Sequence, residues 1–251
     1  MCYNIFTPFQ RRCIITKQKK ENGITLYGII IGILMLALQH GIYLLCYDIA
    51  RLIGITPFFP KIPAIDDAIK IVPLFIIPYV WAYAYWAMGP MAVSKCDMKH
   101  FKNFIAAYLS ACILGGLILI FSPSYMDRVA EGLMDTSRTG FCAELMRFWY
   151  SLDGGDLAYN LFPSFHCINS TICYLGVMKR KEISLWFRIY SLITTLLIYA
   201  STLFVKQHFI TDVIAGILVA LIAYIACTKW NLGRVFDPID KYIKKLFKKK
   251  A

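Results

Sequence analysis

The chain has 251 residues, of which 59% are hydrophobic and 17% charged, and its mean hydropathy is +0.58. These values lie outside the range of ordinary soluble domains and indicate an integral membrane protein. A net charge of +12 would point to nucleic acid in a soluble protein, but most of this excess lies beside apolar segments. Nucleic acid is therefore not an expected partner, and the charge belongs to membrane topology.

Runs of about 20 apolar residues predict six transmembrane helices. The predicted spans lie near residues 26–47, 71–93, 103–122, 163–178, 185–205 and 209–228. The basic segment RRCIITKQKK precedes the first span, which we interpret as a retained helix because no small-residue cleavage site follows it. With no long linker or internal repeat, we expect one all-α domain over 1–251, with an N-terminal flank at 1–25 and a basic tail at 229–251.

The basic residues predict how the chain is oriented in the membrane. An even number of spans places both termini on one side, and 20 of the 27 Lys and Arg residues then lie on that side. The positive-inside rule makes this side cytoplasmic. We therefore expect a multi-pass protein of the cell membrane whose tail, KKLFKKK, touches anionic lipid, and whose segment KQHFITD (206–212) lies at the outer face.

The longest outer segment, about 123–162, is expected to cover something, because forty residues are many for a connection in so small a protein. Within it, FCAELMRFWYSL predicts an amphipathic helix suited to the membrane interface. The apolar face of that helix comprises Phe141, Leu145, Phe148 and Trp149.

Other aromatic and polar residues have two interpretations each. PYVWAYAYW (78–86) favours an aromatic belt or packing surface over a ligand cage. Asp153 and Asp156 fit a Gly-rich turn, or a loop that shapes substrate access. His40 is expected to be a helix contact and His100 a solvated cytoplasmic residue, so neither is expected to reach an outer site. The nine cysteines show no C-x-x-C spacing and favour packing over a zinc site or disulfides.

KQHFITD places three ionisable residues in an otherwise apolar stretch, and such groups are costly in a membrane unless they have a function. His208 and Asp212 are four residues apart, so their side chains can meet on a helix. A carboxylate that holds one imidazole nitrogen protonated leaves the other free to act as nucleophile or base. A histidine that only hydrogen-bonds across helices is the alternative.

FPSFHC (162–167) predicts a helix N-terminus, because Pro163 suits a first turn. The backbone N–H groups of Ser164, Phe165 and His166 would then be free to bind an anion such as phosphate. His166 in that turn can protonate a departing alkoxide. If six spans hold, both histidines start helices at the outer face and lie at one depth.

Two cations complete the predicted site. Lys206 lies beside His208, and Arg138 in the outer segment can bind phosphate bidentately. This set of groups suits phosphoryl transfer through a phosphohistidine. His208 would attack phosphorus, His166 would protonate the leaving oxygen, and water or a lipid hydroxyl would displace the histidine.

PSFH (163–166) and STLFVKQHFITDVIAG (201–216) resemble the second and third signature motifs of the type 2 phosphatidic acid phosphatase superfamily. The resemblance is closest to the branch of inositol phosphorylceramide and sphingomyelin synthases. It implies a membrane enzyme that acts on lipid phosphates or phosphodiesters without metal or cofactor. By motif position it implies His208 as nucleophile, Asp212 as its orienting partner and His166 as acid. The residues that would bind phosphate are Ser164, Phe165, Ser201, Arg138 and Lys206.

The sequence departs from the family pattern where phosphate-binding cations are usual. Thr202 occupies the position of the third-motif arginine, and Phe165 that of a glycine. The first motif survives only as Arg138, with Glu131 at its lysine position. Lys206 lies one helical turn after Thr202 and is either a substitute for the missing charge or a cation that snorkels at the interface.

These observations leave three hypotheses. The leading one is an outer-face phosphatase that hydrolyses a lipid phosphomonoester or diphosphate, such as phosphatidic acid or a polyprenyl diphosphate. The second is a phosphotransferase that passes a headgroup to a lipid hydroxyl. The third is a non-catalytic transporter or binding protein for anionic lipid. The sequence argues against it, because it lacks the pair of Gly/Pro-interrupted spans that usually marks a transporter site.

Overall fold

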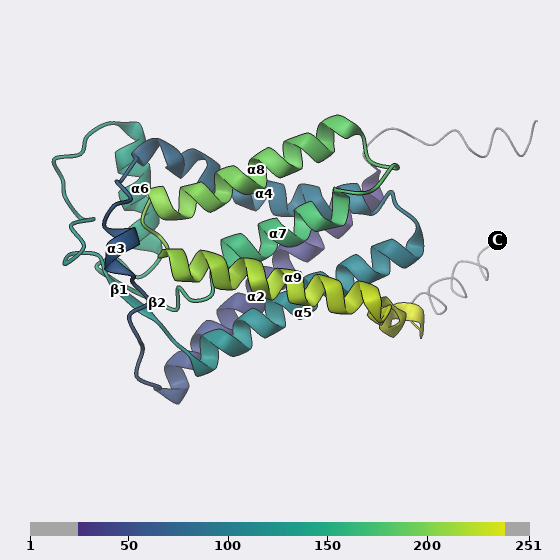
Figure 1. Cartoon of the computed structure of the whole chain (residues 1–251), viewed down its shortest axis with the longest axis horizontal. Helices are drawn as coiled ribbons and strands as arrows, with labels where there is room; N and C mark the ends of the chain where they lie inside the picture. Colours follow the sequence, from purple (N-terminus) through teal and green to yellow (C-terminus); the bar gives the residue numbers. More distant parts are fainter. Residues whose placement is uncertain (1–24, 239–251) are drawn as a thin grey trace, which may run out of the picture.

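The computed structural model describes residues 25–238 as a bundle of helices. The long helices are α2 (Leu26–Ile53), α4 (Ile76–Val93), α5 (Met98–Phe121), α7 (Phe165–Val177), α8 (Leu185–Phe204) and α9 (Ile210–Lys229). They coincide with the six predicted segments and run back and forth along the long axis (Figure 1). The basic N-terminal flank and most of the basic tail lie outside the described residues.

Four of these helices, α2, α5, α8 and α9, are long and apolar enough to cross a membrane. The 18 residues of α4 and the 13 residues of α7 do not meet that standard of length and composition. At 1.5 Å per residue, α7 extends only about 20 Å, whereas the apolar core of a bilayer measures about 30 Å. Six crossings, and the side on which each end lies, therefore stay predictions.

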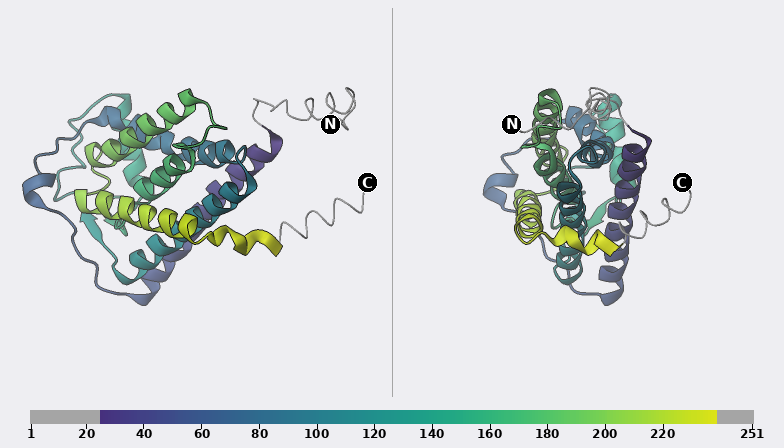
Figure 2. Two further views of the ribbon diagram at one scale, coloured as in Figure 1. Left: turned by 45° about the vertical axis from the view of Figure 1, so that its right-hand side comes forward. Right: turned by 90° about the vertical axis from the view of Figure 1, so that its right-hand side faces the viewer.

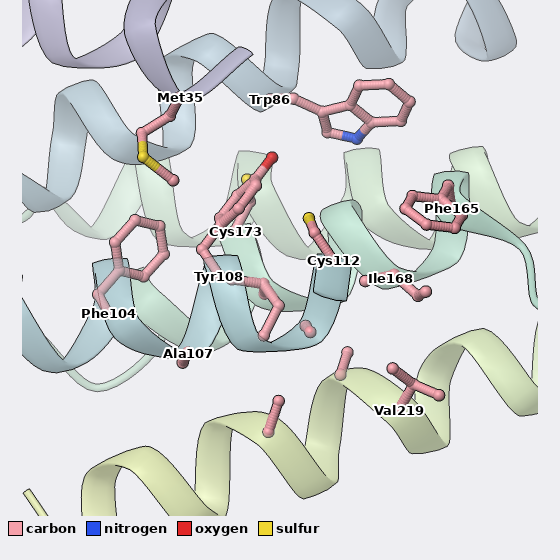
Figure 3. Close-up of a cluster of buried hydrophobic side chains, with 14 of the residues drawn as sticks. Met35, Trp86, Phe104, Ala107, Tyr108, Cys112, Phe165, Ile168, Cys173 and Val219 are labelled. Carbon is pink, nitrogen blue, oxygen red and sulfur yellow. The ribbon is translucent and has the colours of Figure 1, made fainter. Parts of the chain in front are cut away.

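The short helix α7 lies among other helices instead of facing lipid. Nearly all of its side chains are buried, and it packs against α4, α5, α8 and α9. Figure 3 shows Ile168 and Cys173 of α7 beside Tyr108 and Cys112 of α5. Seen along the long axis, α2 and α9 lie on opposite sides of the bundle (Figure 2). Burial on all sides explains why α7 needs no lipid-spanning length.

A second layer covers the end of the bundle at which α7 and α9 begin (Figure 1). It consists of α3 (Pro63–Asp66), η1 (Pro73–Phe75), α6 (Phe141–Leu152) and the antiparallel strands β1 (Tyr125–Asp127) and β2 (Leu157–Tyr159). Its side chains form a separate hydrophobic cluster with Val205 and Phe209. We call this layer the cap. The last described element, η2 (Leu232–Phe236), packs against α5 and α9.

The predicted amphipathic helix is present as α6, and of the predicted apolar face Leu145 and Trp149 pack against the cap cluster while Phe141 and Phe148 face outward. Ala143, Met146 and Tyr150 are buried, whereas Phe141 and Phe148 are 77% and 55% exposed. The Tyr150 hydroxyl donates to the carbonyl of Val205. α6 is thus fixed to the turn before α9, while two phenylalanines point outward.

The seven cysteines within residues 25–238 are all free, and five of them are buried in the bundle. Cys46 of α2 lies against Gly116 of α5, and Cys173 of α7 lies against Gly89 of α4. These thiols act as small packing groups, the role that their spacing favours.

Candidate active site

His208 and Asp212 meet at the start of α9. The distance from His208 Nδ1 to Asp212 Oδ2 is 3.3 Å, and Asp212 is fully buried. The same carboxylate oxygen accepts the N–H of Phe209 at 2.9 Å, so Asp212 caps the helix as well as holding the imidazole. His208 itself precedes the first helical residue, Ile210, and its N–H donates to the carbonyl of Thr202.

His166 lies in the first turn of α7, which begins as the sequence predicted. Ser164 is the N-cap, and its hydroxyl accepts the N–H of Cys167. The Ser164 N–H donates to the carbonyl of Asp212 at 3.0 Å, which ties the starts of α7 and α9 together. Across residues 25–238, the N–H groups of Phe165 and His166 have no hydrogen-bond acceptor. Two of the three predicted backbone donors therefore stay free.

The two histidines face a common cavity of about 480 Å³. Their ring centroids are 6.1 Å apart, and both side chains are buried. α2, α4 and α7 form much of the cavity wall, and residues of the cap complete it. The sequence predicted that His166 and His208 lie close together, because the fourth and sixth spans were expected to begin on the same side of the membrane. The fold places the two rings next to each other.

Aromatic rings from α4 surround His166. Tyr79 stacks on the imidazole with a centroid separation of 4.1 Å. Tyr83 and Trp86 pack on it in T-shaped geometry, with centroid separations of 5.8 and 4.9 Å. All three line the cavity, so PYVWAYAYW forms a cavity wall and not only a packing surface. Nε2 of His166 is buried and has no partner in the part of the chain that the structure describes.

The expectation that His40 cannot reach the site is wrong. His40 lines the same cavity and contacts the ring of Tyr83 at 5.8 Å. The cavity extends between α2 and α4, so a residue in the middle of the first span reaches it from the side. Beside it, Gln39 accepts a hydrogen bond from Asn169 of α7.

Three of the predicted phosphate-binding side chains lie away from the cavity. Arg138 donates to the carbonyl of Gly132 in the cap. Lys206 donates to the carbonyl of Asp66, and its burial lowers the pKa of the amine. The Ser201 hydroxyl donates to the carbonyl of Ile198 within α8. Of the predicted set, Phe165 lines the cavity, and Ser164 orders the start of α7.

Arg128 is the buried cation of this region, and sequence reasoning missed it. Its Nη2 donates to Asp153 Oδ2 at 2.9 Å and to Gln207 Oε1 at 2.8 Å. Nη1 donates to the carbonyls of Tyr150, Asp153 and Gly155. Arg128 thus joins the cap to the residue that precedes His208. The signal in the sequence was an arginine in the apolar surroundings of YMDRVA, directly after β1.

Asp153 is the one carboxylate among the described residues that line the cavity. It lines the wall with His208, while Arg128 holds one of its carboxylate oxygens. Burial raises the pKa of the Asp153 carboxyl, and Arg128 and His208 offset part of that rise. The Gly-rich turn SLDGGD therefore contributes Asp153 and Gly154 to the cavity wall, and its role in substrate access stays a prediction.

Within residues 25–238, no three His, Cys, Asp or Glu side chains are arranged to hold a metal ion. The arrangement nevertheless contains what transfer of a phosphoryl group needs: an imidazole oriented by a carboxylate, a second imidazole and free backbone N–H groups. The fold and site together define a helical membrane protein with a two-histidine cavity under a cap.

Comparison with known proteins agrees with this class. A profile of the PAP2 superfamily matches residues 58–226, which include both histidines, the cap, four of the six long helices and most of α9. The chain belongs to the PAP2 superfamily. Neither the curated proteins nor the solved structures contain a match to it.

Proposed function

We propose that this protein is a lipid phosphatase that cleaves a membrane phosphoester through a phosphohistidine at His208. Membership of the PAP2 superfamily supports phosphatase or phosphotransferase chemistry on lipid phosphates. One observation carries the proposal: His208 is paired with the buried Asp212 and faces the same cavity as His166. The ring centroids of the two histidines are 6.1 Å apart.

The proposed reaction has two steps, formation of the phosphohistidine and its hydrolysis. Asp212 holds the proton on His208 Nδ1, so Nε2 attacks phosphorus; an N–P bond forms as the P–O bond to the lipid breaks. His166 gives its proton to the departing lipid alkoxide, which leaves as an alcohol. In the second step His166 accepts a proton from water, the water oxygen bonds to phosphorus, and the N–P bond breaks. The free N–H groups of Phe165 and His166 would bind the phosphoryl oxygens.

A second candidate is transfer of the phosphoryl group to a lipid hydroxyl, as in the synthases of the resembled branch. The cavity volume supports it, because about 480 Å³ is far more than a phosphate group fills. The first step is unchanged; an alcohol replaces water in the second. Assays that follow free phosphate and labelled lipid product together separate the two acceptors.

Trapping the intermediate tests the proposal directly. The purified protein would be mixed with ³²P-labelled phosphatidic acid in detergent micelles with EDTA, and quenched in alkali, in which phosphohistidine survives. We expect label on a peptide that contains His208, and none in His208→Ala. His100→Gln is the matched control, because that histidine lies on α5, donates from Nε2 to the Gly176 carbonyl and does not line the cavity. Full turnover by His208→Ala on every lipid tested would exclude the mechanism.

A further inference from the structure

A second cavity lies beside the first, at the C-terminal end of α2. Its volume is about 420 Å³, and its wall comes from the last turn of α2, residues 54–57, Pro123, Tyr159 and Asn160. Asn160 also lines the cavity that the two histidines face. The two cavities therefore meet at this side chain.

Asn160 has hydrogen-bonding capacity that the protein itself does not use. The residue is 4% exposed, and its Oδ1 is buried without a hydrogen-bond donor in the part of the chain that the structure describes. Its backbone is held in place, because its N–H donates to the carbonyl of Ser124 at 2.7 Å. A buried amide oxygen without a donor is costly unless water or a ligand supplies one. Oδ1 is thus placed to accept a hydrogen bond from a small hydroxyl compound between the cavities.

The charge of the second cavity favours water over lipid chains. Arg51 is the one lysine or arginine among the described residues that line either cavity. Its guanidinium carbon lies 5.9 Å from the centroid of the Tyr47 ring, which lines the histidine cavity. Arg51 is exposed, and a charged group at such a surface stays hydrated. Water can therefore fill this cavity up to Asn160.

We propose that the second cavity is the passage by which water reaches the phosphohistidine, and that Asn160 positions this water through Oδ1. The proposal rests on the function proposed above and adds the route of the acceptor in the second step. A passage separate from the lipid cavity lets water reach phosphorus without passing the lipid. In that step the water oxygen bonds to phosphorus and the N–P bond to His208 breaks. His166 takes one proton of the water, and the other O–H donates to Asn160.

A pulse–chase experiment separates the two steps. The purified protein would be labelled with ³²P-phosphatidic acid in nonionic detergent micelles and then chased with an excess of unlabelled lipid. Alkali-stable label on His208 reports how fast the phosphohistidine forms and how fast it decays. A change in the second step alone appears as slower decay at an unchanged rate of formation.

Thr56→Trp tests the passage, because Thr56 is exposed and lines the second cavity but not the first. The larger side chain should slow decay by water several-fold. Added diacylglycerol should discharge the phosphohistidine equally fast in this variant and in the wild type, since that alcohol enters through the lipid cavity. Leu52→Trp is the matched control, because Leu52 is 84% exposed in the last turn of α2 and lines neither cavity.

Asn160→Gly tests the positioning residue and keeps the proposal testable if Thr56→Trp does not fold. The backbone φ of Asn160 is 60°, a conformation that glycine adopts without strain. Loss of the hydrogen bond should slow decay by about tenfold, without a change in formation. Asn160→Asp retains an acceptor oxygen and should stay within about threefold of the wild type.

Decay by water that is as fast in Thr56→Trp and Asn160→Gly as in the wild type would overturn the passage and leave the phosphohistidine intact. Equal slowing of formation, hydrolysis and discharge by diacylglycerol would also overturn it, because a water passage serves one acceptor. Absence of label on His208 in the wild-type protein would instead overturn the proposed function.

Discussion

At the residue scale, one carboxylate oxygen of Asp212 makes two hydrogen bonds. It accepts one from the His208 imidazole and one from the N–H of Phe209. Its burial means that no water can replace it. Among the described residues, Asp212 is the one side chain that hydrogen-bonds the His208 imidazole.

Asp212→Asn should lower kcat by about 10³- to 10⁴-fold, because an amide does not fix the Nδ1 proton as a carboxylate does. The measurement is steady-state turnover of the purified variant, with thermal unfolding as the folding control. A loss of less than tenfold in a folded variant would contradict the proposed role of Asp212.

Lys206 is the residue whose interpretation the structure changes most. Its amine donates to the carbonyl of Asp66 in α3 and does not line the cavity. The carboxylate of Asp66 in turn accepts the N–H of Ile210, so this contact secures the start of α9. A substitute for the missing family arginine would have to face the histidines.

Lys206→Met should leave kcat within about threefold of the wild type and act mainly on stability. Its hydrogen bond to a carbonyl is worth roughly 1 to 3 kcal/mol. Activity and unfolding temperature measured on one preparation check this. A drop in kcat of a hundredfold at unchanged stability would restore the phosphate-binding role.

At the scale of elements, the close approach of α7 and α9 sets the distance between the histidines. A Cβ at Gly216 of α9 would lie 2.5 Å from the carbonyl oxygen of Ser164 and 3.0 Å from Cβ of Cys167. Only glycine allows this contact, and the Ser164-to-Asp212 hydrogen bond depends on it.

Gly216→Val should separate the two helix starts, destabilise the protein by at least 1 to 3 kcal/mol, and lower turnover even at temperatures where the protein is folded. Gly41→Val is the matched control, because no other group lies within 4 Å of a Cβ at that position of α2. Equal stability and activity in the two variants would show that the helix approach does not position the site.

At the scale of the whole molecule, Arg128 fastens the cap to the bundle. Its guanidinium lies over the Tyr150 ring at 4.7 Å and bonds to both the 153–155 turn and Gln207. Removing the cation leaves the half-buried Asp153 carboxylate without its charged partner and three carbonyls without their donor. Arg138, a neighbour in sequence, makes only partly exposed contacts.

Arg128→Met should destabilise the protein by about 1 to 3 kcal/mol, because buried hydrogen-bond acceptors lose their donor, and Arg138→Met by no more than about 1 kcal/mol. Arg138→Met should also keep its activity, because its side chain does not reach the cavity. Thermal unfolding and turnover of the two variants test both statements. The reverse order of effects would place the functional cation at Arg138.

The helical class and the positions of the long helices follow from the sequence alone, and the shared depth of the two histidines follows from the expected alternation of those helices. Apolar period, helix-start residues and the four-residue step from His208 to Asp212 are local properties, and local properties can be read along a chain. The family motifs added chemistry to residues that the spacing had already singled out.

Which other groups reach the cavity depends on tertiary contacts. His40, Tyr83 and Asp153 come from three separate regions of the chain, and the packing of α2, α4 and the cap brings them to one wall. Arg128 does not line the cavity but binds Asp153 from the cap. Lys206 was predicted at the site by its charge and its place beside His208, and Arg138 by its charge and its match to the first family motif. Lys206 instead donates to the distant Asp66 carbonyl, and Arg138 to the nearby Gly132 carbonyl. Side-chain direction depends on such contacts, and no pattern along the chain encodes them.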